Sequence, residues 1–217
     1  MKIQWLGHSC FKLTESTGTT VVTDPYDSYI GYKMEPVSAN IVTISHKHKD
    51  HSAIANVSGN PTVIDSVGAW EIGGVGVFGL LSYHDNDKGA KRGENIIYRY
   101  RMDGIDICHM GDIGQEMNVL LGDSIGTVNV LMIPVGGNYT VNAEEAKEYV
   151  DFLMPDIVIP MHYKTENSEL DIDGVSEFIN LFDEEQVVYV EGETIELDRE
   201  KFDGDSTKVY VFSDKKF

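Results

Sequence analysis

The chain has 217 residues, of which 41% are hydrophobic and 24% are charged, a balance typical of a globular protein with a sizeable core. This length is usual for one domain, so we expect a single domain over residues 1–217. Acidic side chains outnumber basic ones by 36 to 17, and the net charge of −19 disfavours binding to nucleic acid or to an anionic membrane surface.

The two cysteines, Cys10 and Cys108, each lie inside an apolar run, which favours reduced, buried thiols over a disulfide. The first residues lack the apolar stretch of a signal peptide, and no segment has the roughly 18 apolar residues needed to cross a bilayer. We therefore expect a cytoplasmic protein.

Short apolar runs separated by glycine and proline dominate the first half of the chain and predict β-strands. They cover residues 3–6, 10–13, 19–23 and 41–45, then, beyond a short helix expected after His51, residues 62–64, 75–81, 95–101 and 105–109. This half is expected to form hairpin-rich sheets.

Beyond Asp112, helical and extended patterns alternate. Helical spacing predicts helices at residues 113–121, 143–153 and 175–182, and apolar runs predict strands at 128–134, 157–160, 187–190 and 194–197. Asn142 and Glu145 have the spacing of a capping box at the start of the second helix. Many strands with a few helices predict sheets packed together with helices outside.

The densest group of metal-binding residue types directly follows the expected strand at 41–45. His46, His48, Asp50 and His51 lie within six residues. Imidazole and carboxylate groups are donors that zinc, manganese and iron accept. In a turn after a strand, alternating side chains can point at one ion while the next pair points at a neighbouring ion. A solvated surface turn is the alternative for this segment alone.

The arrangement His-x-His-x-Asp-His after an apolar strand resembles the hallmark motif of the metallo-β-lactamase superfamily at every defined position. That family has a further histidine, a bridging aspartate and a final histidine, each at a strand end. His84, Asp112 and His162 occupy the corresponding places here. The resemblance implies an α+β fold, the four-layer αββα sandwich of the metallo-β-lactamase fold.

The resemblance also implies a site for two divalent metal ions. One ion is expected on His46, His48 and His84, the other on Asp50, His51 and His162, with Asp112 bridging both. Zn²⁺ is the first expectation for a histidine-rich site, with Mn²⁺ or Fe²⁺ as alternatives. Asp112 and Asp50 are the catalytic candidates, because Asp112 joins the two ions and Asp50 can accept a proton during turnover.

His109 competes with His84 as third ligand of the first ion, because both precede Asp112. We favour His84, because the Gly-Asp turn after His109 points Asp112 inward and leaves His109 behind it on the strand. His109 then orients a ligand, or is a hydrogen-bonded core histidine.

Four short segments resemble small stand-alone hydrolases of this superfamily related to L-ascorbate 6-phosphate lactonase. They are Gly-His-Ser at residues 7–9, Thr-Asp-Pro at 23–25, Pro-Val-Gly-Gly at 134–137 with Thr140, and Met-His-Tyr at 161–163. The resemblance implies that His8 and Asp24 lie beside the metals, where they contact substrate or orient ligands; a plain turn residue is the alternative for each. Gly136 and Gly137 precede a helix and are candidates to offer backbone amides to an anionic group, with a tight turn as the alternative.

These residues predict a metal-dependent hydrolase in which a hydroxide bridging two divalent metals attacks a lactone, ester or phosphoester of a small, anionic substrate. A mono-iron sulfur dioxygenase or another iron oxidoreductase of the same fold is the first alternative. An RNA- or DNA-processing nuclease and a regulatory protein without activity are the others. The expected partner is a small-molecule substrate, without nucleic acid or membrane, and the chain is compatible with a homo-oligomer.

Overall fold

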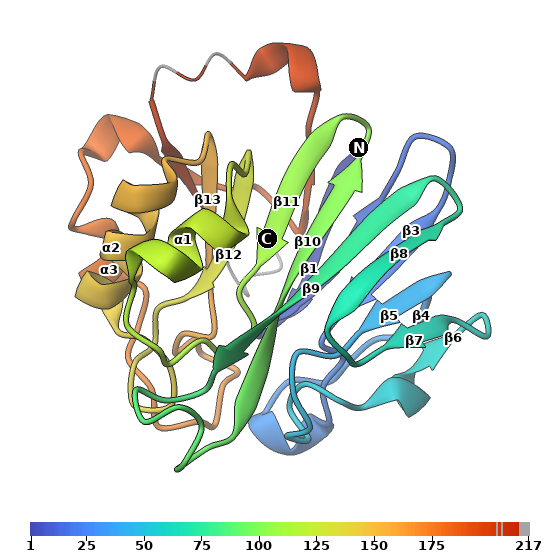
Figure 1. Ribbon diagram of the computed structural model, residues 1–217, viewed down its shortest axis with the longest axis horizontal. Coiled ribbons are helices and arrows are strands. Elements are labelled where there is room, and N and C mark those ends of the chain that lie inside the picture. The colour runs from blue at the N-terminus through green and yellow to red at the C-terminus, as the bar shows by residue number, and fades with distance from the viewer. Residues whose placement is uncertain (203, 205, 213–217) are drawn as a thin grey trace.

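Two β-sheets lie face to face in the computed structural model, which describes residues 1–202, 204 and 206–212 (Figure 1). Within these residues, the first sheet has the strand order β15 (Thr194–Glu196), β1 (Lys2–Gly7), β2 (Cys10–Thr14), β3 (Thr20–Thr23), β5 (Ile41–Thr43) and β7 (Thr62–Ile64). The second has the order β14 (Val187–Tyr189), β16 (Lys208–Val211), β13 (Ile157–Met161), β12 (Val130–Pro134), β11 (Ile105–His109), β10 (Glu94–Met102), β9 (Val75–Tyr83) and β8 (Gly68–Ile72). The short strands β4 (Val37–Ser38) and β6 (Val57–Ser58) pair with each other.

Parallel pairing brings several strand ends to one edge of each sheet. In the first sheet β3, β5 and β7 run parallel, with Thr23 opposite Thr43 and Thr43 opposite Ile64. In the second sheet β11, β12 and β13 run parallel, with His109 opposite Met132. Since each of these strands ends at the same edge as its neighbours, the residues that follow them come close together.

The main hydrophobic core lies between the two sheets. Fully buried side chains from the first sheet, such as Phe11 and Val22, belong to the same cluster as Tyr100 and Met132 of the second sheet. Burying each such side chain contributes roughly 1.5–3 kcal/mol. The Tyr100 hydroxyl lies 2.6 Å from Oγ1 of Thr43, so a buried hydrogen bond also joins the sheets.

A second core joins the outer face of the eight-stranded sheet to the helices α1 (Val119–Ile125), α2 (Ala143–Leu153) and α3 (Ser176–Ile179). The expected capping box is confirmed: Asn142 accepts from the Glu145 amide at 3.0 Å, and Glu145 accepts from the Asn142 amide at 2.9 Å. The α+β sandwich is therefore confirmed. In the described residues the three α-helices contribute to this second core, whereas Ile30, on the turn Ser28–Ile30, belongs to the core between the sheets.

Shorter 3-10 turns complete the described structure, at Ser28–Ile30, Ile54–Asn56, Glu184–Gln186 and Arg199–Lys201. The second of these is the short helix expected after His51. No helix within the described residues is long and apolar enough to cross a membrane.

The helix expected over residues 113–121 begins later than predicted. Residues 113–118 form a loop, and α1 starts only after Asn118, whose side chain accepts a hydrogen bond from the Leu121 amide at 3.1 Å. The Gly114 amide donates to Tyr83 at 3.0 Å, and a side chain on Gly114 would lie 2.5 Å from the His84 carbonyl oxygen. Packing against the end of β9 therefore overrides the local helical pattern. The helix expected over 175–182 is likewise reduced to α3.

Candidate metal centre

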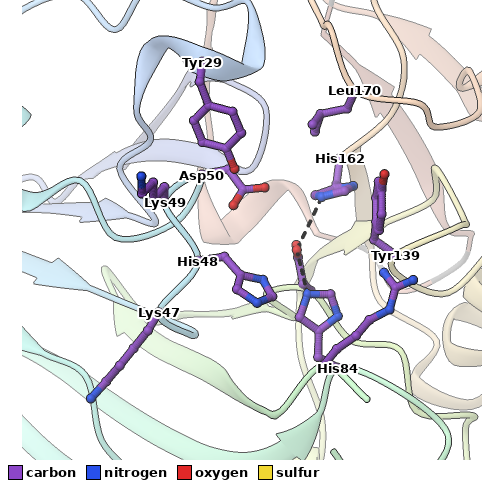
Figure 2. Close-up of a pocket in the computed structure, with 11 residues that line it drawn as sticks. Tyr29, Lys47, His48, Lys49, Asp50, His84, Tyr139, His162 and Leu170 are labelled. Atoms are coloured by element: carbon purple, nitrogen blue, oxygen red, sulfur yellow. Dashed lines mark ion pairs between the residues drawn. The ribbon is translucent and has the colours of Figure 1, made fainter.

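The histidine and aspartate residues singled out in the sequence gather where strands of the two sheets end. His8 lies in the turn from β1 to β2, Asp24 follows β3, the 46–51 segment follows β5, and His84, Asp112 and His162 follow β9, β11 and β13. Residues separated by up to 154 positions therefore share one site. The labelled His48, Asp50, His84 and His162 side chains surround a common space (Figure 2).

Asp112 lies at the centre of this cluster. Its Oδ2 atom is 3.1 Å from Nε2 of His51 and 3.3 Å from Nε2 of His84. The same oxygen is 3.4 Å from Nε2 of His162 and 3.6 Å from Nε2 of His46. One carboxylate therefore faces four imidazoles that come from three different strand ends, because His46 and His51 both follow β5.

The potential ligand atoms form overlapping groups, each with its members within 4.8 Å of one another. The groups are His46, His48 and His84; His46, His51 and Asp112; and His8, Asp50, His51 and His162. All seven residues predicted as ligands from the sequence are brought together. His8 joins them, although the sequence suggested only a role beside the metals.

His84, rather than His109, lies in the cluster with His46 and His48. His109 is buried behind the site, where its Nε2 donates to the Ser9 carbonyl at 2.8 Å and its Nδ1 accepts from the Gly111 amide at 3.2 Å. Both ring nitrogens are thus occupied by backbone groups, as in a hydrogen-bonded core histidine.

Asp24 orients two of the imidazoles. His51 Nδ1–H donates to Asp24 Oδ2 at 2.8 Å, and the Ser45 hydroxyl donates to the same oxygen at 2.6 Å. The Ser45 oxygen in turn lies 2.9 Å from Nδ1 of His46 and can accept its proton. Because a carboxylate only accepts, this network directs a proton to Nδ1 of both histidines, and Nε2 of each faces Asp112 as the nitrogen available to a metal ion. The sequence missed Ser45, although it directly precedes His46.

Several site residues hold a backbone conformation that side chains other than glycine rarely adopt. His8, Asp24 and His162 have φ angles of 52°, 39° and 51°. Such conformations cost of order 1–3 kcal/mol each and persist where the surrounding structure enforces them, often at functional sites. The fold therefore stabilises these turns through packing elsewhere.

The charges in the cluster favour a bound cation. Burial alone would raise the pKa of Asp112, but the imidazoles of His162 and His51 hold this pKa well below its usual range. Burial and the neighbouring His51 lower the pKa of His46 to about 3. Burial would also lower the pKa of His51, but Asp112 and Asp24 raise it well above its ordinary value. Asp112 is thus anionic and His46 neutral at neutral pH, the states in which both bind metals.

Buried polar atoms without partners test whether a metal fits. Nε2 of His46, Nε2 of His51 and Oδ1 of Asp112 are buried and make no hydrogen bond to any described residue. Leaving such atoms unpaired costs about 1–3 kcal/mol each. A divalent ion would satisfy them, and their nitrogen and oxygen donors suit Zn²⁺, Mn²⁺ or Fe²⁺. The residues present therefore fit a metal centre.

A cavity of about 480 Å³ opens onto the cluster and exposes side chains from both sides of Asp112. Tyr29, Tyr139 and Leu170 form other parts of its wall (Figure 2). This volume is in the range of sites for small molecules. The cluster is thus accessible to a ligand.

Basic side chains also line this cavity, namely Lys47, Lys49 and Arg92. In the described part of the chain, the lysine and arginine ion pairs are made by Lys2, Arg99, Arg101 and Lys147, which leaves these three without a carboxylate partner. Arg92 lies 4.8 Å from the ring centroid of Tyr139. Arg92 and Tyr139 were not predicted as site residues, because they approach each other only in the folded chain.

A tight loop holds the backbone of Arg92 in place. The buried Asp85 carboxylate accepts backbone hydrogen bonds from Asp87, Gly89, Lys91 and Arg92 at 2.8–3.0 Å. This loop directly follows His84. The loop therefore connects the strand end that carries His84 to the cavity wall, and the Asp85 carboxylate holds its backbone in place.

Gly137 lies in a tight turn, which was the alternative to an anion site in this segment. The Gly137 amide donates to the Val141 carbonyl at 3.2 Å, which closes a turn. A side chain on Gly136 would overlap the carbonyl oxygen of His162. The absence of a side chain at Gly136 thus allows the strand end that carries His162 to approach.

Comparison with known proteins gives consistent matches. Residues 2–162 match the family described as "Beta-lactamase superfamily domain". A UPF0173 metal-dependent hydrolase of Thermococcus onnurineus is 29% identical over 194 residues, which cover 76% of this chain and 85% of that protein. Another, from Desulforamulus reducens, is 30% identical over 200 residues with the same coverage of each chain.

A solved structure extends the similarity over nearly the whole chain. A Thermotoga maritima protein, named as a candidate zinc-dependent hydrolase of the metallo-β-lactamase superfamily, is 39% identical. The TM-score is 0.81, and the match covers 98% of both chains. The chain is thus similar in sequence and fold to proteins named as metal-dependent hydrolases.

Proposed function

The chain belongs to the metallo-β-lactamase superfamily and is a metal-dependent hydrolase, and on this basis we propose that it uses two divalent ions to hydrolyse a small, anionic substrate. The proposed bond is that of a lactone, an ester or a phosphoester. When bound, two such ions supply hydroxide near neutral pH and polarise the oxygen of the bond under attack.

The ligand groups support a division between two ions. We assign His46, His48 and His84 to one ion and Asp50, His51 and His162 to the other, with Asp112 shared. Zn²⁺ is the first choice for this histidine-rich set, and Mn²⁺ or Fe²⁺ are the alternatives. The position of Asp112, within 3.1–3.6 Å of four imidazoles, is the single observation that carries the proposal.

The protein's own residues would prepare the site for catalysis. Asp24 and Ser45 fix the orientation of His51 and His46 through hydrogen bonds of 2.6–2.9 Å. Asp50 lies at the edge of the cavity, with its side chain 12% exposed, where it can accept a proton from the substrate side. These hydrogen bonds orient the metal-binding imidazoles before a substrate binds, which lowers the free energy needed to reach the transition state.

The cavity wall supports an anionic substrate. Lys47, Lys49 and Arg92 all line the same cavity, and within the described residues none of them makes an ion pair with a carboxylate. Stacking on Tyr139 limits the freedom of the Arg92 guanidinium. A guanidinium so placed can bind a carboxylate or phosphate group through two hydrogen bonds.

The test is elemental analysis of the protein as isolated, followed by a panel of lactones, esters and phosphoesters in anionic and neutral pairs. We expect two divalent ions per chain and faster turnover of the anionic member of a pair. Protein that contains two ions but hydrolyses no member of the panel would contradict the proposed bond class. Iron together with oxygen uptake on a persulfide would instead indicate the dioxygenase.

A further inference from the structure

His8 lies outside the 46–51 segment, at the tip of the turn between β1 and β2. The pairing of these strands shifts register between Trp5 and Gly7, and Nε1 of Trp5 donates to the His8 carbonyl at 3.0 Å. A side chain on Gly7 would lie 2.7 Å from the Tyr26 hydroxyl, so only glycine fits the step before His8. The contacts of Trp5 and Tyr26 therefore hold the backbone of this turn in place.

The His8 side chain is 1% exposed, and neither ring nitrogen has a hydrogen-bond partner among the described residues. His109 provides a direct comparison, because it is equally buried but both its ring nitrogens contact backbone groups. A buried imidazole normally satisfies at least one nitrogen, and leaving both unpaired is costly. The environment of His8 is thus incomplete without a further partner.

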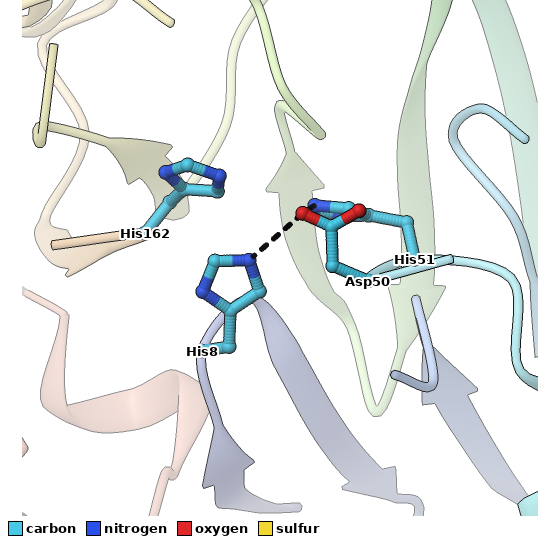
Figure 3. A group of neighbouring side chains, drawn as sticks. All are labelled: His8, Asp50, His51 and His162. Carbon is cyan, nitrogen blue, oxygen red and sulfur yellow. Dashed lines mark ion pairs between the residues drawn. The ribbon is translucent and has the colours of Figure 1, made fainter. Parts of the chain in front are cut away.

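The open side of His8 faces Asp50, His51 and His162 (Figure 3). Nε2 of His8 and Nε2 of His51 each lie 3.8 Å from the same oxygen of Asp50. The rings of His8 and His162 have centroids 4.3 Å apart. Two donor atoms about 2.0–2.2 Å from one shared ion lie roughly 3–4.4 Å from each other, so the two separations of 3.8 Å suit a common ion.

We propose that His8 is itself a ligand of the ion held by Asp50, His51 and His162, an inference that rests on the proposed two-metal centre. With Asp112 shared, this ion has five protein ligands, His8, Asp50, His51, His162 and Asp112. The other ion has four, His46, His48, His84 and Asp112. Five donors exceed the four of a tetrahedral site, so the site that contains His8 is suited to an ion of higher coordination number. We expect this site to bind its ion more tightly than the four-ligand site does.

Substitutions at His8 can separate the effect of the imidazole ring on metal binding from the effect of the backbone conformation at this position. Asparagine and aspartate both tolerate the positive φ of 52° at this position. They have nearly the same shape, but only the aspartate carboxylate is a good metal ligand. His109→Gln is the matched control, because His109 is a buried histidine outside the ligand groups.

The experiment titrates metal-free wild type and variants with Zn²⁺ and with Mn²⁺, and measures the affinity of each of two sites together with the metal-induced shift in Tm. We expect His8→Asn to weaken one of two sites by roughly 100-fold or more, with the other site retained and the metal-free Tm close to wild type. His8→Asp should recover at least tenfold of this loss. His109→Gln should bind both ions like wild type.

The inference would be overturned if His8→Asn bound both ions with wild-type affinity, or if His8→Asp and His8→Asn were equally weak. Failure of the proposed two-metal centre is a separate result, because wild type itself would then bind fewer than two ions, and failure of the proposed bond class would appear only in the substrate panel. The comparison of variants therefore tests His8 independently of which bond the enzyme hydrolyses.

Discussion

The carboxylate of Asp24 accepts a hydrogen bond from Nδ1 of His51 at 2.8 Å, and the same oxygen accepts the hydroxyl of Ser45. Through Ser45 the network reaches Nδ1 of His46. One buried carboxylate thus orients an imidazole in each of the two proposed ligand sets. Asp24 itself is held anionic, because His51 lowers its pKa in spite of burial.

Replacement of Asp24 by asparagine should weaken metal binding without removing a ligand. The amide can donate to Nδ1 of His51, which would favour the tautomer that is protonated on the metal-facing Nε2. The affinity for metal should therefore fall roughly 10–100-fold. Equilibrium metal titration measures the change. Asp27→Asn, an exposed aspartate three residues on, is the control and should bind metal like wild type. Equal affinities for Asp24→Asn and wild type would show that the hydrogen bond does not orient the ligand.

Loss of the Arg92 charge should affect substrate binding rather than chemistry. A charge-assisted hydrogen bond contributes about 1.5–3 kcal/mol, so Arg92→Gln should raise KM for an anionic substrate roughly 10–100-fold with little change in kcat. KM for a neutral analogue should not change. Lys91→Gln is the control, because Lys91 is exposed and contributes only its backbone to the Asp85 loop. Equal effects of Arg92→Gln on the anionic and neutral substrates would argue against anion recognition.

A methyl group at Gly136 should displace His162. It would overlap the His162 carbonyl oxygen, and relief of such overpacking typically costs 1–3 kcal/mol. Gly136→Ala should therefore lower both Tm and metal affinity. In Gly174→Ala the nearest atom would be 4.0 Å away, and we expect little change there. Wild-type metal affinity in Gly136→Ala would show that this close approach does not position His162.

The metal-free protein should lose stability as the pH falls below about 6.5. Burial and the neighbouring His162 lower the pKa of His8 to about 4 in the folded chain, whereas the unfolded value is 6.5. Between these values the unfolded chain binds a proton that the folded chain does not, which costs about 1.4 kcal/mol per pH unit for this group. Stability with respect to this group is therefore full above pH 6.5, where His8 is neutral in both states, and falls as the pH decreases toward 4.

Urea unfolding of metal-free wild type and His8→Asn at pH 7, 6 and 5 measures this dependence. The variant should lose stability less steeply, because it lacks one of the histidines with a lowered pKa. His46, with a pKa of about 3, remains in both proteins and acts in the same direction. His51 opposes it in both, since its pKa is raised. Identical slopes would mean that His8 is not buried as a neutral ring.

The strand-end positions of the site were predictable from the sequence. Apolar runs predicted β5, β9, β11 and β13, and the residues after them, His46, His84, Asp112 and His162, converge in the structure. This follows because strand period and strand ends are local properties. The preference for His84 over His109 also agrees with the cluster geometry.

Features that depend on tertiary packing were not predictable. Strands β4 and β6 have only two residues each and form because they pair with each other. The loop at 113–118 has helical spacing but packs under His84 instead. The inward direction of the His8 ring and the contact between Arg92 and Tyr139 join segments whose proximity no local pattern encodes.

The most direct test of the two-metal centre is the metal content and turnover of Asp112→Ala beside wild type, with Asp123→Ala on the exposed face of α1 as control. Asp112 faces imidazoles from both ligand sets, so its loss should remove both ions and abolish hydrolysis, while wild type and the control retain two ions and full activity. An Asp112→Ala protein that kept two ions and wild-type turnover would contradict the account.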